Sequence, residues 1–180
     1  IGVSFAFSNS GVTNVIFGRD IANGGSGLNV NLNMLGQGSP DGFRIIGAAT
    51  DDYSGSSVSG AGDVNGDGLQ DILIGAYQAS PTVSKPGAGI SYVVYGRRLP
   101  PGATFLPDVE LAQLAADKSL GFRVLGAQGA DQSGTSVSGA GDVNGDNMDD
   151  VIIGAIGADP PNQGGNDFGI AYVVFGFPTT

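Results

Sequence analysis

The chain has 180 residues, an apolar content of 41% and a mean hydropathy of +0.11, as expected of a folded domain with a buried core. Seventeen acidic residues against seven basic ones give a net charge of −10, so nucleic acid and anionic membranes are poor partners. The absence of His and Cys excludes Ser–His–Asp and Cys–His catalytic sets, disulfides and zinc–thiolate sites, and no apolar run approaches the ~18 residues of a membrane span.

Glycine and aspartate dominate the residues that favour turns. The chain has 33 Gly, and sixteen of its seventeen acidic residues are Asp, with Glu110 as the only Glu. Asp and Gly are typical of turns and metal-binding loops, whereas helix-rich proteins favour Glu. The composition therefore predicts many short strands joined by tight turns, which is an all-β fold.

The first 48 residues contain two predicted strands. One is the β-branched and aromatic run GVTNVIFG at 11–18, and the other is FRIIG at 43–47. Ile1-Gly2 precedes the first run as Ile74-Gly75 precedes its later counterpart, so residues 1–48 are predicted to be the end of strand two, then strands three and four, of one repeat unit. Because the chain starts without Met or a signal peptide, we expect it to be a processed or excised piece.

Residues 49–127 are predicted to form one complete four-stranded unit. Gly, Pro, Asn and Asp clusters separate its four candidate strands, which lie at 56–60, 72–76, 89–96 and 122–126. The connection Arg97–Leu120 holds the one helix-like stretch, Val109–Asp117, whose counterpart is Val30–Gly38. We expect one or two turns there, with Leu111 and Leu114 covering the edge of the unit.

Residues 128–180 repeat this pattern. The segment 122–155 aligns with 43–76 without a gap at an offset of 79, and 22 of 34 positions are identical. Candidate strands at 135–139, 151–155 and 169–176 supply strands one to three of a further unit, and its fourth strand is missing. Open strand edges recruit other strands, so we expect self-association head to tail, with one chain's 43–47 strand completing another's last unit, or adjoining units of one parent protein.

The third strand of each unit is expected to be buried continuously. Both Tyr92–Tyr95 and Tyr172–Phe175 consist of aromatic and β-branched residues without polar alternation. A run of this kind is typical of a strand covered on both faces. The sequence therefore predicts that neighbouring units stack on both sides of these strands.

Two aspartate-rich loops, at 63–71 and 142–150, are the candidate metal sites. Both fit D-x-N-x-D-[GN]-x-x-D, and calcium takes six to eight hard oxygen ligands. Position 6 needs a left-handed residue, which Gly68 and Asn147 can supply. Magnesium demands a stricter octahedron and zinc lacks its preferred ligands, so calcium is favoured over a metal-free turn, with two ions per chain. The predicted ligands are Asp63, Asn65, Asp67, Leu69 and Asp71 in the first loop, and Asp142, Asn144, Asp146, Met148 and Asp150 in the second, with Leu69 and Met148 acting through their carbonyls.

These motifs resemble FG-GAP repeats, the blades of the integrin-α-type β-propeller. The matching stretches run from Phe43 through Gly55–Gly68 and Asp71–Ala76 to Tyr92–Gly96, and the segment 122–176 is similar. The resemblance implies four-stranded antiparallel blades, about two and a half in this chain, with a calcium loop between the first two strands. It also implies an extracellular or cell-surface protein of adhesion or ligand binding.

The leading functional hypothesis is a non-catalytic, calcium-binding module of such an adhesion or assembly protein. A protein or glycan ligand would contact the divergent loops 77–88 and 156–168. One alternative is a lectin-like propeller, for which Tyr53, Tyr77 and Phe168 are the aromatic residues near the loops. Another is the accessory propeller of a secreted enzyme.

Overall fold

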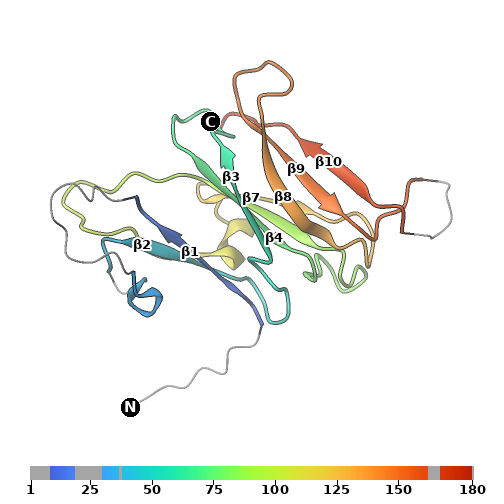
Figure 1. The fold of residues 1–180 in the computed structure, drawn as a ribbon, viewed down its shortest axis with the longest axis horizontal. Helices are drawn as coiled ribbons and strands as arrows, with labels where there is room; N and C mark the ends of the chain where they lie inside the picture. Colours follow the sequence, from blue (N-terminus) through green and yellow to red (C-terminus); the bar gives the residue numbers. More distant parts are fainter. Residues whose placement is uncertain (1–8, 19–29, 37, 162–166, 180) are drawn as a thin grey trace, which may run out of the picture.

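The described strands of this chain form three small sheets. The computed structural model describes residues 9–18, 30–36, 38–161 and 167–179. Within them, ten strands form one four-stranded and two three-stranded sheets, arranged along the molecule in chain order (Figure 1), and two short 3₁₀ helices lie in the connections. The predicted all-β fold with propeller-type blades is confirmed. The predicted end of strand two at Ile1-Gly2 lies outside the described residues.

The central sheet is a complete antiparallel blade. It contains β3 (Ser57–Gly62), β4 (Asp71–Ala76), β5 (Ile90–Val94) and β7 (Gly121–Leu125), in that order. Each strand therefore pairs with the next of the four predicted strands.

The flanking sheets repeat parts of this blade. The C-terminal sheet has the order β8 (Ser133–Gly141), β9 (Asp150–Ala155), β10 (Ile170–Val174), so β10 is an edge strand. The N-terminal sheet has the order β1 (Val12–Ile16), β2 (Gly42–Ile46), β6 (Val109–Glu110). The β1–β2 register matches the β5–β7 register, because Val12 pairs with Ile46 as Ile90 pairs with Leu125.

The small residues of β3 and β8 reflect close contact between neighbouring blades. The Ser57 hydroxyl donates to the Gly134 carbonyl at 2.7 Å. A Cβ on Gly139 would lie 2.8 Å from the Gly60 carbonyl oxygen, a distance that real Cβ atoms do not show. Larger side chains would push these two strands apart, which explains why the first strand of each repeat is rich in Gly and Ser.

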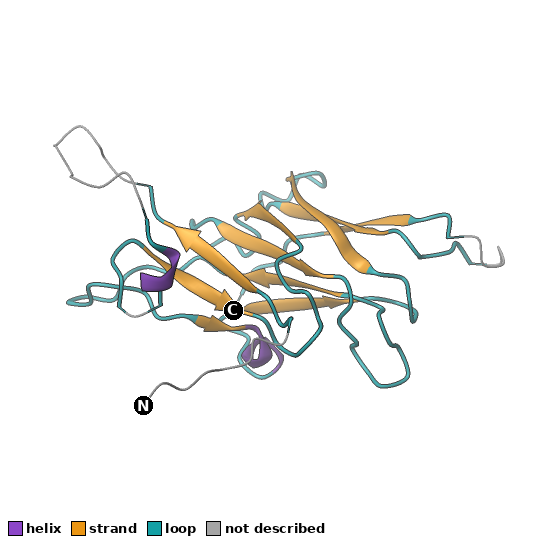
Figure 2. Cartoon of the chain, turned by 60° about the horizontal axis from the view of Figure 1, so that its bottom comes forward, coloured by secondary structure: helices purple, strands orange, loops and turns teal. Residues whose placement is uncertain are grey.

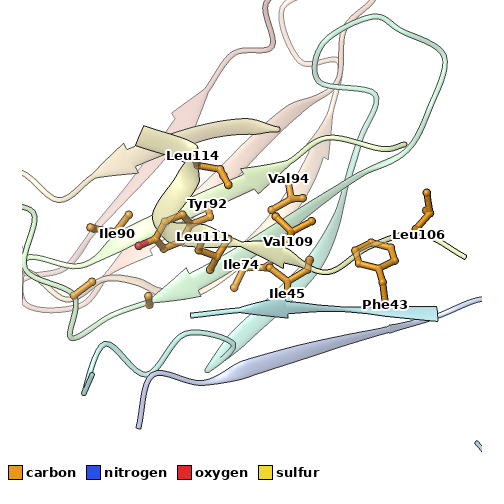
Figure 3. Close-up of a cluster of buried hydrophobic side chains, with 12 residues drawn as sticks. Phe43, Ile45, Ile74, Ile90, Tyr92, Val94, Leu106, Val109, Leu111 and Leu114 are labelled. Carbon is orange, nitrogen blue, oxygen red and sulfur yellow. The ribbon is translucent and has the colours of Figure 1, made fainter. Parts of the chain in front are cut away.

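Successive sheets lie side by side (Figure 2), and apolar side chains pack between them. One cluster joins β2 to β4 and β5 through Ile45, Ile74 and Tyr92, together with the connection that carries β6 (Figure 3). A second joins the central blade to the C-terminal sheet through residues such as Leu73 and Ile153. The central blade is therefore covered on both faces.

Burial of the third strands depends on these neighbours. All five residues of β5 are buried, as predicted. The prediction is wrong for Tyr172–Phe175, because burial alternates along β10, and Val173 and Phe175 are 48% and 53% exposed. The face of β10 turned away from the central blade has no described sheet against it, whereas both faces of β5 are covered.

The Arg97–Leu120 connection reaches back to the preceding sheet. It forms β6, which pairs in parallel with Ile45 and Ile46 of β2, and then the 3₁₀ helix η2 (Leu111–Ala115). Leu111 and Leu114 are fully buried, as expected. The other 3₁₀ helix, η1 (Leu32–Met34), lies in the counterpart segment.

This arrangement argues against one form of the predicted assembly. The 43–47 strand, which is β2, lies between β1 and β6. On its β6 side the Arg44 backbone N–H donates to Asp108 Oδ1 at 2.8 Å. With both edges occupied, β2 would have to give up these bonds to complete the last blade of another copy, which argues against that form of strand exchange.

Candidate metal centre

Each aspartate loop is the turn between the first two strands of a blade. The first loop joins β3 to β4, and the second joins β8 to β9. Gly68 and Asn147, at loop position 6, have φ values of 82° and 68°. The predicted left-handed residue is therefore confirmed in both loops, and Asn147 is among the few non-Gly residue types that take this conformation readily.

In the first loop, the side-chain oxygens of positions 1, 3 and 5 cap the loop's own backbone. Asp63 accepts from the N–H groups of Asp67 at 3.0 Å and Gly68 at 2.8 Å. Asn65 Oδ1 also accepts from the Asp67 N–H, and Asp67 Oδ1 accepts from the Leu69 N–H at 2.8 Å. These bonds curl the loop and bring three oxygen-bearing side chains to the inside of one turn.

The second loop repeats these contacts. Asp142 accepts from the N–H groups of Gly145, Asp146 and Asn147 at 2.7–3.1 Å. Asn144 Oδ1 accepts from the Asp146 N–H at 2.9 Å. These backbone donors, with the Asn147 N–H first among them, hold the pKa of Asp142 below its usual value. Both sequences thus form the same curled turn.

The aspartate at position 9 ties the loop to the end of the third strand. Asp71 is buried and accepts from the N–H groups of Val64, inside the loop, and Gly96, just after β5. Asp150 does the same with Val143 and Gly176. Burial raises the pKa of Asp71 to about 6, against the lowering effect of its two N–H donors.

The donor chemistry of the loops fits a hard cation. Within the described residues, no three acidic side chains converge tightly enough to hold an ion by themselves. However, a carboxylate has about four acceptor positions, so the bonds above leave lone pairs available on each Asp. No Lys or Arg in the described part of the chain forms an ion pair with either loop. The oxygen-only donors fit calcium, with Leu69 and Met148 as the predicted carbonyl donors.

Asp149 is a residue of this region that sequence reasoning missed. Its carboxylate accepts from the Asp63 N–H at 2.7 Å, and its own N–H donates to the Asp63 carbonyl at 3.0 Å. A Cβ on Gly62 would overlap this carboxylate. Asp149 therefore links the second loop to the first. The available signal was position 8 of the loop, where the first copy has Gln70.

The environments of the two loops differ. Val64 of the first loop is buried in the cluster between the central blade and the C-terminal sheet, whereas its counterpart Val143 is 57% exposed. A hollow of about 650 Å³, lined by Asn65, Asp67 and Lys118 among others, opens beside the first loop. The hollow therefore leaves the first loop open to an ion from solvent, although Val64 in the same loop is packed between the two sheets.

Comparison with known proteins identifies the repeat. Residues 54–94, which run from just before β3 to the end of β5 and include the first loop, match the family model described as "FG-GAP repeat". Residues 54–94 are an FG-GAP repeat. It is 30% identical over 101 residues to "Integrin alpha pat-2" of Caenorhabditis briggsae. That alignment covers 56% of this chain and 7% of the relative.

Proposed function

We propose that this chain is a non-catalytic, calcium-binding part of an adhesion-type β-propeller at the cell surface or outside the cell. The observation that carries the proposal is the pair of oxygen-rich loops with matching hydrogen bonds and matching left-handed residues. The FG-GAP match and the similarity to an integrin α chain support an adhesion-type module with adjoining blades as its partners. Neither described helix is long or apolar enough to cross a membrane.

Calcium would stiffen each blade at the turn between its first two strands. The ligands of one ion would be the residues at positions 1, 3, 5, 7 and 9, so one ion would join the curled turn to the start of the second strand. Mutual repulsion of the clustered carboxylates opposes this packing when no cation is bound. Two divalent ions would change the formal charge of the chain from −10 to −6.

Calorimetry and thermal melting with calcium and with a chelator test this proposal. We expect two ions per chain and a higher midpoint with calcium, because a ligand at 100 times its Kd stabilises the native state by about 2.7 kcal/mol. Asp67→Ala and Asp146→Ala should each remove one ion and leave the other. Asp117→Ala, at an exposed Asp outside both loops, is the matched control and should leave both. An unchanged midpoint without binding heat would refute calcium binding.

A glycan-binding role is the second candidate function. The rings of Tyr53 and Tyr77 lie 5.8 Å apart between their centroids, and Tyr53 is 42% exposed. Such a pair can act as an apolar platform for a sugar ring, and Phe168 is a further exposed aromatic on the C-terminal blade. Glycan-array binding that Tyr77→Ala abolishes, while calcium binding persists, would support this role. Equal binding by the variant would refute it.

A further inference from the structure

Two segments of the chain share the pattern Val-x-Leu-x-x-Leu. They are Val30–Leu35 and Val109–Leu114, and each lies between the third and fourth strands of its blade. Val109, Leu111 and Leu114 are all 0–1% exposed. In contrast, Leu32, the counterpart of Leu111, is 48% exposed.

The buried segment closes the seam between the N-terminal sheet and the central blade. Val109 pairs with Ile45 of β2, while Leu111 and Leu114 belong to the same cluster as Ile74 and Tyr92 (Figure 3). The segment therefore belongs to the central blade but adds a short strand to the preceding one. No described sheet precedes the N-terminal sheet, and Leu32 is exposed there, although Leu35, the counterpart of Leu114, is buried.

An ion pair fixes the start of this segment. Asp108 Oδ2 accepts from Arg44 Nε at 3.0 Å and Nη2 at 2.6 Å, and its Oδ1 accepts from the Arg44 backbone N–H. Asp108 thus satisfies both the side chain and the edge backbone of Arg44. Because both carboxylate oxygens of Asp108 accept from the same residue, the contact defines the register of the segment as well as its position.

The seam between the central blade and the C-terminal sheet is lined by equivalent residues, but no described segment fills it. Val124, Ile153 and Tyr172, the counterparts of Ile45, Ile74 and Tyr92, line a cavity of about 150 Å³. Tyr172 is only half-buried, whereas Tyr92 is 1% exposed. A cavity of this size with apolar walls accepts a benzene-sized apolar group.

The counterpart of Arg44 at this seam is Arg123. It occupies the same register position, opposite Tyr92 on β5, and its strand β7 is at the edge of the sheet. Arg123 is exposed, and no carboxylate of the described residues bonds to it. The apolar cavity and Arg123 therefore have the same relative positions as the leucine-filled space and Arg44 have around the buried segment.

We propose that this seam is a binding site for a third segment of the type Asp-Val-x-Leu-x-x-Leu, supplied by a further repeat. Its Asp would bond to Arg123, its Val would extend β7 as a short parallel strand, and its two Leu side chains would fill the cavity beside Tyr172. The seam that is already closed in this chain shows the same contacts, made by Asp108, Val109, Leu111 and Leu114. Such a site goes beyond the proposed calcium function and does not depend on it.

The test uses the full 180-residue chain and a synthetic peptide with the sequence of residues 105–118. We expect the dye-labelled peptide to bind, and the amides of β7 and β10 to exchange more slowly. A peptide with Val109→Asn, Leu111→Asn and Leu114→Asn is the control and should not bind. Arg123→Glu should weaken binding at least about tenfold, because the hydrogen bonds between the peptide Asp and a charged partner would be lost. Arg98→Glu, at an exposed cation outside the cavity lining, should leave binding unchanged.

A second experiment covers the case in which the free peptide binds too weakly to be detected. The same two peptides, joined after Thr180 by a Gly/Ser linker, gain a high effective concentration. Slower exchange of β10 with the native peptide alone would support the site, and equal exchange with both would overturn it. The unfused chain could instead self-associate, with slower amide exchange in β10. If Leu32→Asp abolishes both effects, the seam is occupied by a second copy of the chain. That result would overturn a further repeat as the source.

Discussion

Replacing Leu111 by Ala tests how much the connecting segment contributes to stability. The side chain is fully buried between two sheets, and burying a Leu side chain stabilises the folded state by about 1.5–3 kcal/mol. The cavity left by its removal adds to the loss, so Leu111→Ala should cost about 2–5 kcal/mol. For a chain of this size, a loss of about 3 kcal/mol corresponds to a fall in midpoint of about 6–12 °C.

The matched control is Leu32→Ala, because Leu32 has the same place in the repeat and differs in burial. It is 48% exposed, so about 1 kcal/mol or less should be lost. Urea unfolding and thermal melting of both variants, in the same calcium buffer, give the comparison. Equal losses of unfolding free energy in the two variants would refute the conclusion that the preceding sheet determines how much this Leu side chain contributes to stability.

Three further predictions concern single side chains. Val94→Asp should destabilise the chain by at least about 3 kcal/mol, because the charge would be buried. Val174→Asp should cost less, because Val174 is half-buried, and chemical denaturation measures both losses. Asp108→Asn should cost about 1–2 kcal/mol and reduce the salt dependence of unfolding, because it weakens the bond to Arg44; the same loss at all salt concentrations would contradict an ionic contribution. Burial raises the pKa of Asp52, so the native state holds this proton more tightly than the unfolded state does. The resulting stability is present below the unfolded pKa and is lost as pH rises through the raised native value, and Asp52→Asn should flatten urea midpoints measured between about pH 3 and 7.

The candidate metal loops could be located from the sequence because their signal is local. Nine residues specify the curled turn, and the need for a left-handed residue at position 6 limits the choice to Gly or Asn. Both loops adopt the predicted backbone, whereas their metal ligands stay a prediction. Asp149 was missed because its partner, Asp63, lies 86 positions away in the chain, and position 8 of the loop has no local requirement.

The order of strands within a blade can be predicted from the sequence alone. The 79-residue repeat, the Gly-bounded β runs and the turn residues are all readable along the chain, because they reflect local backbone preferences and repetition. Which of two equivalent side chains is buried depends instead on how the sheets pack together. Leu111 and Leu32 have the same place in the repeat, as have Val93 and Val173, yet only Leu111 and Val93 are covered. Burial depends on whether another sheet lies against that face, and the sequence of one repeat does not specify whether a sheet packs beside it.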